Sequence, residues 1–235
     1  MPRLKGLLFD KDGTLIDFDR TWGPAAFEVM REMAQGDEAV VARLAELNHF
    51  IVAEKRFLRS SPLVAGTSAS YGPLWAQALG RPDGPELHAE MDRRFKHWGL
   101  AMVSPIGEPL AVLEALAAEG YRLGIATNDA EASALVQADR LGLMPHLDFV
   151  AGYDSGHGGK PEPGMVLAFA AKIGASPSEV ALVGDSTHDL DAAHAAGAVA
   201  IAVLTGPAPR HELEPHADHV VGSIADLPAY LRGLG

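Results

Sequence analysis

The sequence predicts an α/β fold in which a doubly wound parallel sheet carries an all-helical insertion. Two observations lead to this prediction: short apolar runs alternate with helical patterns over most of the chain, and one long segment lacks that alternation. Such alternation is typical of a parallel sheet covered by helices. We place the six strands at residues 6–9, 122–126, 148–150, 180–183, 198–203 and 219–221.

Three segments of the alternating region carry helix signals. Residues 130–141 form an amphipathic pattern closed by Gly142, which predicts a helix between the second and third strands. Ser176, with proline next and glutamate three residues later, predicts a capping box and a single helical turn before the fourth strand. Ser223 begins the last helix in the same manner, with Asp226 three residues on.

The segment from residue 17 to residue 99 lacks the alternation. It contains helical patterns such as residues 39–47, no convincing strand, and several breaks at glycine and proline. The alternation resumes only near residue 105. We therefore predict two domains: a sheet domain of residues 1–16 and 100–235, and an all-helical insertion of residues 17–99.

The composition restricts the class of protein. The chain has 235 residues, a formal net charge of -12 and no cysteine. The negative charge argues against nucleic-acid and anionic membrane partners, and no apolar run is long enough to span a bilayer. The absence of cysteine excludes disulfides, thiolate zinc sites and a cysteine nucleophile. We expect a cytoplasmic protein because the N-terminus has no signal-peptide pattern, and no motif indicates a protein partner.

The most informative segment is Asp10-Lys11-Asp12-Gly13-Thr14, which follows the apolar run of the first strand directly. Two carboxylates one residue apart repel each other, and burying them is costly. A hard divalent cation such as Mg2+ relieves that cost because it prefers oxygen ligands. Taken alone, the segment is also compatible with a strand-end turn, since Asp-Gly is a common turn dipeptide.

Three other segments join this one. Thr127 and Asn128 end the second strand, Lys160 stands between glycine and proline, and Asp185 is followed four residues later by Asp189. Taken alone, Thr127 is an ordinary strand residue and Lys160 an ordinary surface lysine. In this order, the four segments resemble the four motifs of the haloacid dehalogenase-like (HAD) hydrolases over the whole chain. The chain is identified as a member of the phosphatase branch, with a Rossmann-like sheet and a small helical cap similar to that of the phosphoglycolate phosphatase-like group.

The resemblance implies phosphoryl transfer to an aspartate, followed by hydrolysis. It gives Asp10 the role of nucleophile and Asp12 that of general acid and then general base. Thr127 and the amide of Asn128 would bind phosphoryl oxygens, and Lys160 would offset the negative charge of the phosphate and the nucleophile. In open parallel sheets such residues meet beyond the carboxyl ends of the strands.

The resemblance also implies Mg2+ as the cofactor. The expected ligands are Asp10, the backbone carbonyl of Asp12, Asp185 and Asp189, the last either through water or as a residue that supports the other ligands. Two acids beside a phosphate would otherwise repel the substrate anion, so the metal and the lysine together would make binding possible.

A basic cluster of this acidic chain lies in the insertion, at Lys55, Arg56 and Arg59. We call it the cap basic cluster. It is a candidate for binding a second anionic group on the substrate, and a solvated helix face is the alternative interpretation.

The function implied by the resemblance is that of a Mg2+-dependent phosphatase for a small phosphorylated metabolite, either phosphoglycolate-like or a sugar phosphate. Asp12 argues against the branches of the family that dehalogenate, cleave phosphonates or pump ions, because these lack an acid at that position. A phosphomutase keeps both acids and stays as the alternative. A phospho-receiver signalling module is more distant, because receivers are much shorter and carry their acidic pair on another strand. No motif names the substrate.

Overall fold

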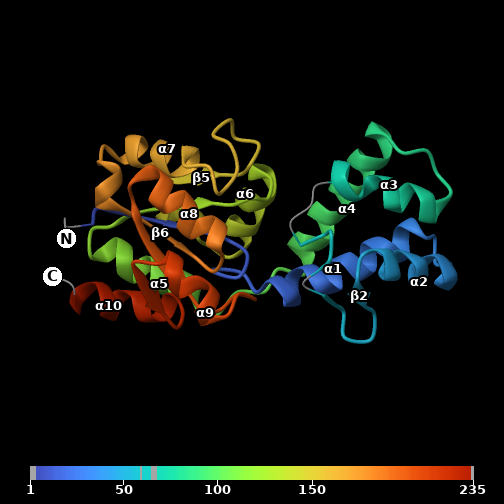
Figure 1. The fold of residues 1–235 in the computed structure, drawn as a ribbon, viewed down its shortest axis with the longest axis horizontal. Helices are drawn as coiled ribbons and strands as arrows, with labels where there is room; N and C mark the ends of the chain where they lie inside the picture. Colours follow the sequence, from blue (N-terminus) through green and yellow to red (C-terminus); the bar gives the residue numbers. More distant parts are fainter. Residues whose placement is uncertain (1–3, 59, 65–67, 234–235) are drawn as a thin grey trace. The chain divides into compact units, whose positions relative to one another are not determined.

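A computed structural model describes residues 4–58, 60–64 and 68–233 of the chain. These residues form two compact units (Figure 1). The core unit holds the residues up to 17 and those from 105 onward, and the cap unit holds residues 18–104. Helix α4 (Pro85–Ala101) belongs to the cap unit and continues past residue 99, so the core unit resumes later than the sequence predicted.

The core unit is built around one sheet of parallel strands in the order β5-β4-β1-β6-β7-β8. The strands are β1 (Gly6–Phe9), β4 (Arg122–Ala126), β5 (Phe149–Ala151), β6 (Val180–Gly184), β7 (Val199–Val203) and β8 (His219–Val221). The strand order reverses at β1, which pairs with β4 on one side and β6 on the other, so the sheet is doubly wound. The predicted parallel sheet is confirmed, although β5 and β7 begin one residue later than expected.

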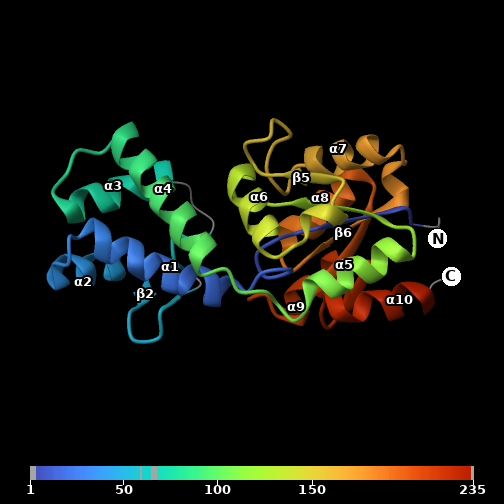
Figure 2. The ribbon, with the colours of Figure 1, turned by 180° about the vertical axis from the view of Figure 1, so that it is seen from behind.

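Helices cover both faces of this sheet, as Figures 1 and 2 show. Helices α7 (Gly164–Ile173) and α8 (Thr187–Ala196) pack on one face, and α5 (Pro109–Ala118) and α10 (Leu227–Gly233) lie on the other. Helix α6 (Glu131–Arg140) lies beside β5, and α9 (Arg210–Leu213) follows β7. The short 3-10 turns are η1 (Met144–His146), η2 (Pro177–Glu179), η3 (Glu214–His216) and η4 (Ile224–Asp226). Capping boxes begin η2 and η4, as the sequence predicted.

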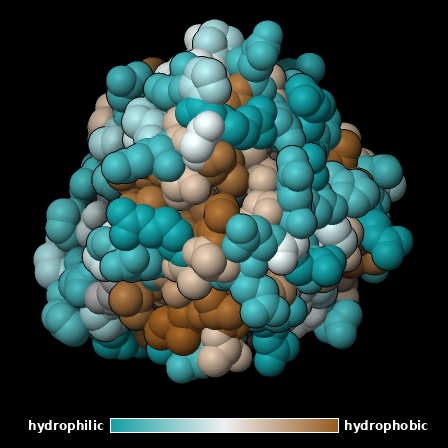
Figure 3. Space-filling model, turned by 90° about the vertical axis from the view of Figure 1, so that its right-hand side faces the viewer, coloured by the Kyte–Doolittle hydropathy of each residue, from teal (hydrophilic) through white to brown (hydrophobic). Residues whose placement is uncertain are grey.

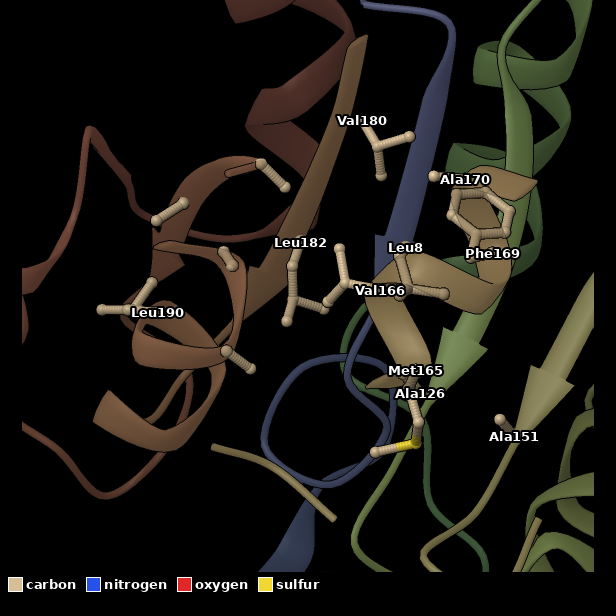
Figure 4. Packing of buried hydrophobic residues seen from close by; sticks show 14 of the residues in the cluster. Leu8, Ala126, Ala151, Met165, Val166, Phe169, Ala170, Val180, Leu182 and Leu190 are labelled. Atoms are coloured by element: carbon tan, nitrogen blue, oxygen red, sulfur yellow. The ribbon is translucent and has the colours of Figure 1, made fainter. Parts of the chain in front are cut away.

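Apolar side chains of the central strands pack against α7 (Figure 4). Leu8 of β1 and Leu182 of β6 lie in one cluster with Val166 and Phe169 of α7, and all four side chains are fully buried. Burial of each such side chain contributes roughly 2–3 kcal/mol. This packing holds β1 in the centre of the sheet, so Asp10 stands where the buried strand ends.

The cap unit has its own apolar core. Helices α1 (Phe18–Met33), α2 (Glu38–Leu47), α3 (Ser68–Leu79) and α4 enclose a cluster that includes Met30, Leu44, Trp75 and Met91, all fully buried. The indole of Trp75 donates a hydrogen bond to Asn48 Oδ1 at 3.0 Å, which satisfies a buried polar group inside this core. The insertion is therefore a separately packed body.

A short antiparallel pair, β2 (Phe50–Ile51) and β3 (Arg56–Phe57), interrupts the helices of the cap unit. Strands of two residues are too short for an alternating pattern to appear in the sequence, so the purely helical expectation missed them. Lys55 lies in the connecting turn with φ of 47°. Its carbonyl oxygen approaches α1 at Gly23, where an added Cβ would lie 1.8 Å away, so this contact requires glycine.

None of the helices in the described part of the chain is long and apolar enough to cross a membrane. The face shown in Figure 3 is mostly hydrophilic, with hydrophobic residues gathered toward its middle and lower part. Among the described residues, the large apolar side chains that are more than a third exposed are Val52, Leu58, Val64, Tyr153 and Leu167. The other large apolar side chains are covered to a greater extent, many of them within one of the two cores.

Candidate active site

The carboxyl ends of three neighbouring strands form the framework of the site. Asp10 follows β1, Thr127 follows β4 and Asp185 follows β6, and β1 pairs in register with both neighbours. Lys160 reaches the same place from the loop between β5 and α7, and Asp189 from the first turn of α8. The fold therefore brings together residues that are separated by up to most of the length of the chain.

Lys160 is the central cation of this site. Its ammonium lies 2.5 Å from Asp10 Oδ1 and donates a hydrogen bond to the carbonyl of Ala126 at 2.9 Å. It also lies 2.6 Å from Asp189 Oδ1, an ion pair that lacks hydrogen-bond geometry. The lysine side chain is 4% exposed, so these contacts act with little screening by solvent. Lys160 thus neutralises part of the charge of two buried acids.

Asn128 holds the loop that carries Lys160. Its side-chain amide donates to the Lys160 carbonyl at 2.9 Å, and its Oδ1 accepts from the Lys160 backbone N–H at 2.8 Å. The Thr127 hydroxyl accepts from the Asp129 N–H at 3.1 Å, and Thr127 itself is buried. The sequence suggested a phosphate contact for the Asn128 backbone; it gave no sign that the side chain would fix the lysine loop.

Three buried carboxylates converge beside this lysine. Asp10, Asp185 and Asp189 each offer one oxygen, and these oxygens lie within 4.8 Å of one another. Asp189 Oδ2 accepts from the N–H and the hydroxyl of Ser186 at 3.0 and 2.6 Å, which caps α8 and fixes the carboxylate. Asp189 Oδ1 is buried and has no hydrogen-bond donor among the described residues. Hard oxygen donors in this arrangement fit a divalent cation.

The electrostatics of the triad favour an added positive charge. Burial raises the pKa of Asp10 from 3.8 to about 7; Lys160 opposes that rise, and the charges of Asp189 and Asp12 add to it. Burial, with the charges of Asp10 and Asp189, also raises the pKa of Asp185 well above its usual range. Burial alone would lower the pKa of Lys160, but its two carboxylate partners outweigh burial and raise it. The buried carboxylates of the site therefore carry more negative charge than Lys160 can balance.

Glycines make room for the Asp185 carboxylate. An added Cβ at Gly13, which has φ of 87°, would lie 2.4 Å from Asp185 Oδ2, and one at Gly206 would lie 1.6 Å from the same oxygen. Thr14 donates to Asp185 Oδ1 at 3.4 Å, and Thr205 donates to the Gly13 carbonyl at 2.6 Å. The loop after β7 thus closes one side of the site, a contribution that no sequence motif indicated.

A second buried lysine, Lys11, lies between Asp10 and Asp12 in the sequence. The side chain of Lys11 is 1% exposed, and its ammonium lies 2.6 Å from Asp12 Oδ2, 3.0 Å from Asp129 Oδ2 and 2.7 Å from Gln137 Oε1. Burial would lower the pKa of Lys11, but Asp12 and Asp129 outweigh it and raise the pKa. The sequence analysis gave Lys11, Asp129 and Gln137 no role. The available signal was Gln137, a polar residue on the buried face of the predicted helix, beside Ala138.

Lys55 and Arg56 of the cap basic cluster lie in the β2–β3 hairpin, where the alternative interpretation had placed a helix face. Lys55 stacks on the Phe27 ring at 4.6 Å and Arg56 pairs with Glu54 at 2.5 Å, while Arg59 falls outside the described residues. Lys55 and Arg56 line a pocket of about 430 Å³ in the cap unit, together with Asp19, Arg20, Pro24, Ala53 and Glu54. The pocket is mixed in charge, because acids stand beside the bases.

The sequence as a whole matches a known family. A sequence model described as haloacid dehalogenase-like hydrolase matches residues 4–197, most of the chain. The chain belongs to this family. The predicted resemblance is confirmed, and the site described above lies within the matched segment.

Relatives narrow the comparison within the HAD-like hydrolases. A phosphoglycolate phosphatase of Rhodospirillum rubrum is 33% identical over 210 residues, which cover 86% of this chain and 80% of the relative. A phosphoglycolate phosphatase of Chromobacterium violaceum is 30% identical over 235 residues, covering 97% and 96%. These relatives show the chain to be a phosphatase of the HAD-like family, a phosphoric monoester hydrolase.

Solved structures show the same fold. A predicted phosphoglycolate phosphatase of Haemophilus somnus has a TM-score of 0.72 at 22% identity, with 98% of this chain and 99% of that chain covered. A putative beta-phosphoglucomutase of Thermotoga maritima has a TM-score of 0.71 at 20% identity, covering 99% and 100%. At these identities the likeness concerns the fold alone.

Proposed function

We propose that this HAD-like phosphatase hydrolyses a small phosphorylated metabolite through an aspartyl-phosphate on Asp10, with Mg2+ as cofactor. The observation that carries the proposal is the buried contact between Lys160 and Asp10 beside two further acids. A carboxylate is a poor nucleophile unless the phosphoryl group is held in line and its charge is neutralised. Lys160 supplies one of the necessary positive charges, beside Oδ1 of Asp10.

The reaction has two steps. In the first, an oxygen of Asp10 bonds to phosphorus as the bond to the leaving oxygen breaks, and Asp12 gives that oxygen a proton. In the second, a water oxygen attacks phosphorus, Asp12 takes the water proton, and the bond between phosphorus and Asp10 breaks. Phosphate leaves, and both aspartates return to their starting forms. Thr127 and the Asn128 amide donate to phosphoryl oxygens throughout, while Lys160 offsets their charge.

The metal proposal rests on the triad of acids. Asp189 Oδ1 is buried and pairs with Lys160 at 2.6 Å but has no hydrogen-bond donor among the described residues, and burial together with the neighbouring acids raises the pKa of Asp10 and of Asp185. Asp10, Asp185, Asp189 and the backbone carbonyl of Asp12 would hold the ion, since all are oxygen ligands. When bound, Mg2+ supplies positive charge that offsets the phosphoryl oxygens and the acids around them.

Phosphoglycolate is the leading candidate substrate because both relatives named above are phosphoglycolate phosphatases. It is small and carries a carboxylate in addition to its phosphate. In this proposal the cap basic cluster would supply positive charge for that second group, and the adjacent acids Asp19 and Glu54 would disfavour larger polyanions. A sugar phosphate is the other substrate class in this proposal. A cytoplasmic location stays a prediction.

The test is a panel of phosphorylated metabolites, scored by phosphate release and kcat/KM with Mg2+ and with EDTA. We expect phosphoglycolate to rank first, activity to vanish in EDTA, and Asp10→Asn to abolish it. Asp139→Asn makes the same chemical change on the exposed face of α6 and should keep full activity. Full activity in chelator would contradict the metal proposal. Transfer of phosphate to another sugar hydroxyl, without release, would instead establish the phosphomutase alternative.

A further inference from the structure

Lys11 is a buried cation that the reaction steps above leave without a role. Its neighbours in sequence are the two acids Asp10 and Asp12, yet its side chain turns into the interior and is 1% exposed. Placing an ammonium there costs desolvation that its partners must offset. Its partners come from three different segments: Asp12 in the loop after β1, Asp129 in the loop after β4, and Gln137 on α6.

The three contacts of Lys11 differ in kind. Its ammonium donates a hydrogen bond to Gln137 Oε1 at 2.7 Å and pairs with Asp12 Oδ2 at 2.6 Å, whereas Asp129 Oδ2 at 3.0 Å is an ion-pair partner without hydrogen-bond geometry. Gln137 is fully buried on α6, and α6 is fixed by its packing against β5. The Lys11 ammonium therefore contacts both Gln137, which is held in place by helix α6, and Asp12.

The two buried lysines divide the acids of the site between them. Lys160 contacts Asp10 and Asp189, and Lys11 contacts Asp12 and Asp129. The nucleophile and the proposed acid–base residue thus have separate cationic partners, although they are only two positions apart. This separation lets each carboxylate be oriented independently of the other.

We infer that Lys11 is a positioning residue whose ammonium, anchored by Gln137 and Asp129, fixes the Asp12 carboxylate for proton exchange with the leaving oxygen and with water. The inference rests on the proposed function, because it assigns the orientation of the proposed general acid.

Orientation matters here because an unrestrained aspartate samples several rotamers and a broad χ2 range. Proton transfer requires the acid within hydrogen-bond reach of the leaving oxygen, and well-placed acids contribute about 10²- to 10⁴-fold to rate. Loss of the Lys11 contact should therefore slow only the steps that need the Asp12 proton. Substrate binding should change little, since Lys11 faces Asp12, Asp129 and Gln137.

The experiment compares two leaving groups in single turnovers with Mg2+. The nitrophenolate of p-nitrophenyl phosphate leaves as a stable anion, whereas an alkyl phosphate such as phosphoglycolate needs a proton on its leaving oxygen. For Lys11→Met we expect the alkyl rate to fall at least about tenfold, the fast nitrophenol burst to stay within about threefold, and KM for both to stay within about threefold. Equal losses with both substrates, or no loss with either, would overturn the inference.

A second set of variants covers the case in which Lys11→Met does not fold. Gln137→Met removes the anchor but leaves the lysine and both acids, and it should show the same selective loss in smaller degree. Gln137→Glu keeps an acceptor for Lys11 and should restore the wild-type ratio of the two rates. An unchanged ratio in Gln137→Met would also overturn the inference. Lys5→Met, a lysine whose pair with Glu179 lies at the start of β6, is the matched control and should behave as wild type.

Failure of the proposed function gives a different result. Asp12→Asn should show the largest selective loss with the alkyl phosphate. If Asp12→Asn shows no selectivity between the leaving groups, Asp12 is not the acid, and the proposed mechanism itself is wrong. If Asp12→Asn is selective and the variants at Lys11 and Gln137 are not, only the positioning role is wrong.

Discussion

The raised pKa of Asp10 predicts that the metal-free enzyme loses stability as pH rises. The folded-state pKa of about 7 lies above the ordinary value of 3.8, so the folded protein binds this proton more tightly than the unfolded chain. The contribution of this bound proton to the free energy of unfolding is fully present below about pH 4 and is lost as pH rises through 7. Integrated over pH 5 to pH 8, this single group accounts for about 2–3 kcal/mol.

Asp10→Asn should remove this pH dependence, because the amide has nearly the same shape and does not titrate. The variant also removes a charge that raises the pKa of Asp185. The loss of the Asp10 titration and the smaller pKa shift of Asp185 therefore both weaken the fall in stability with rising pH. Lys160 loses Asp10 as a partner in the variant but keeps Asp189, whose charge also raises its pKa, so we expect it to stay charged and this cost to be nearly constant over pH 5 to pH 8. The advantage of the variant over wild type should therefore grow by about 2–3 kcal/mol between these pH values.

Urea unfolding in EDTA at pH 5 and pH 8 measures this difference. Asp139→Asn on the exposed face of α6 serves as the control and should follow wild type at both pH values. In saturating Mg2+ the pH-dependent gap should shrink, because the cation balances the same charge that the proton balanced. A difference between Asp10→Asn and wild type that is independent of pH in EDTA would refute the reasoning.

Three further predictions concern activity. Asp12→Asn should lower kcat for phosphoglycolate by about 10²-fold or more while p-nitrophenyl phosphate still phosphorylates the enzyme. An unchanged kcat would show that Asp12 is not the general acid and base. Gly206→Ala should press on Asp185 and raise the half-saturating Mg2+ concentration about tenfold or more, with kcat at saturating Mg2+ largely kept. A lower kcat at unchanged Mg2+ requirement would speak against that account. Neutralising the cap basic cluster should raise KM for phosphoglycolate about tenfold and KM for p-nitrophenyl phosphate much less. Equal effects on the two KM values would show that the cluster does not bind the second anionic group of the substrate.

The core unit was predictable because its signals are local. The strands are short apolar runs bounded by polar residues, and the capping boxes at Ser176 and Ser223 need only four consecutive positions. The four motifs fall at strand ends, and strand ends in a parallel sheet meet at one edge. The sequence therefore indicated which residues converge, as the contact between Lys160 and Asp10 across 150 positions illustrates.

The remaining contacts depend on packing that no local pattern carries. Gln137 reaches Lys11 over 126 positions, and a glutamine on a helix ordinarily faces solvent. Gly206 matters only because the loop after β7 passes against Asp185, a contact between two loops. The strands of the β2–β3 hairpin are two residues long, too short for a periodic pattern, so a helix face was one of the two interpretations of Lys55 and its neighbours.

The measurement that tests the central claim most directly is capture of the phosphorylated enzyme. Radiolabelled p-nitrophenyl phosphate is mixed with the enzyme, the reaction is quenched in acid within one turnover, and the labelled peptide is sequenced. We predict label on Asp10, greater accumulation in Asp12→Asn, where hydrolysis of the intermediate is slowed, and none in Asp10→Asn. Phosphate release at the normal rate without labelled protein, or label on a different residue, would contradict the account.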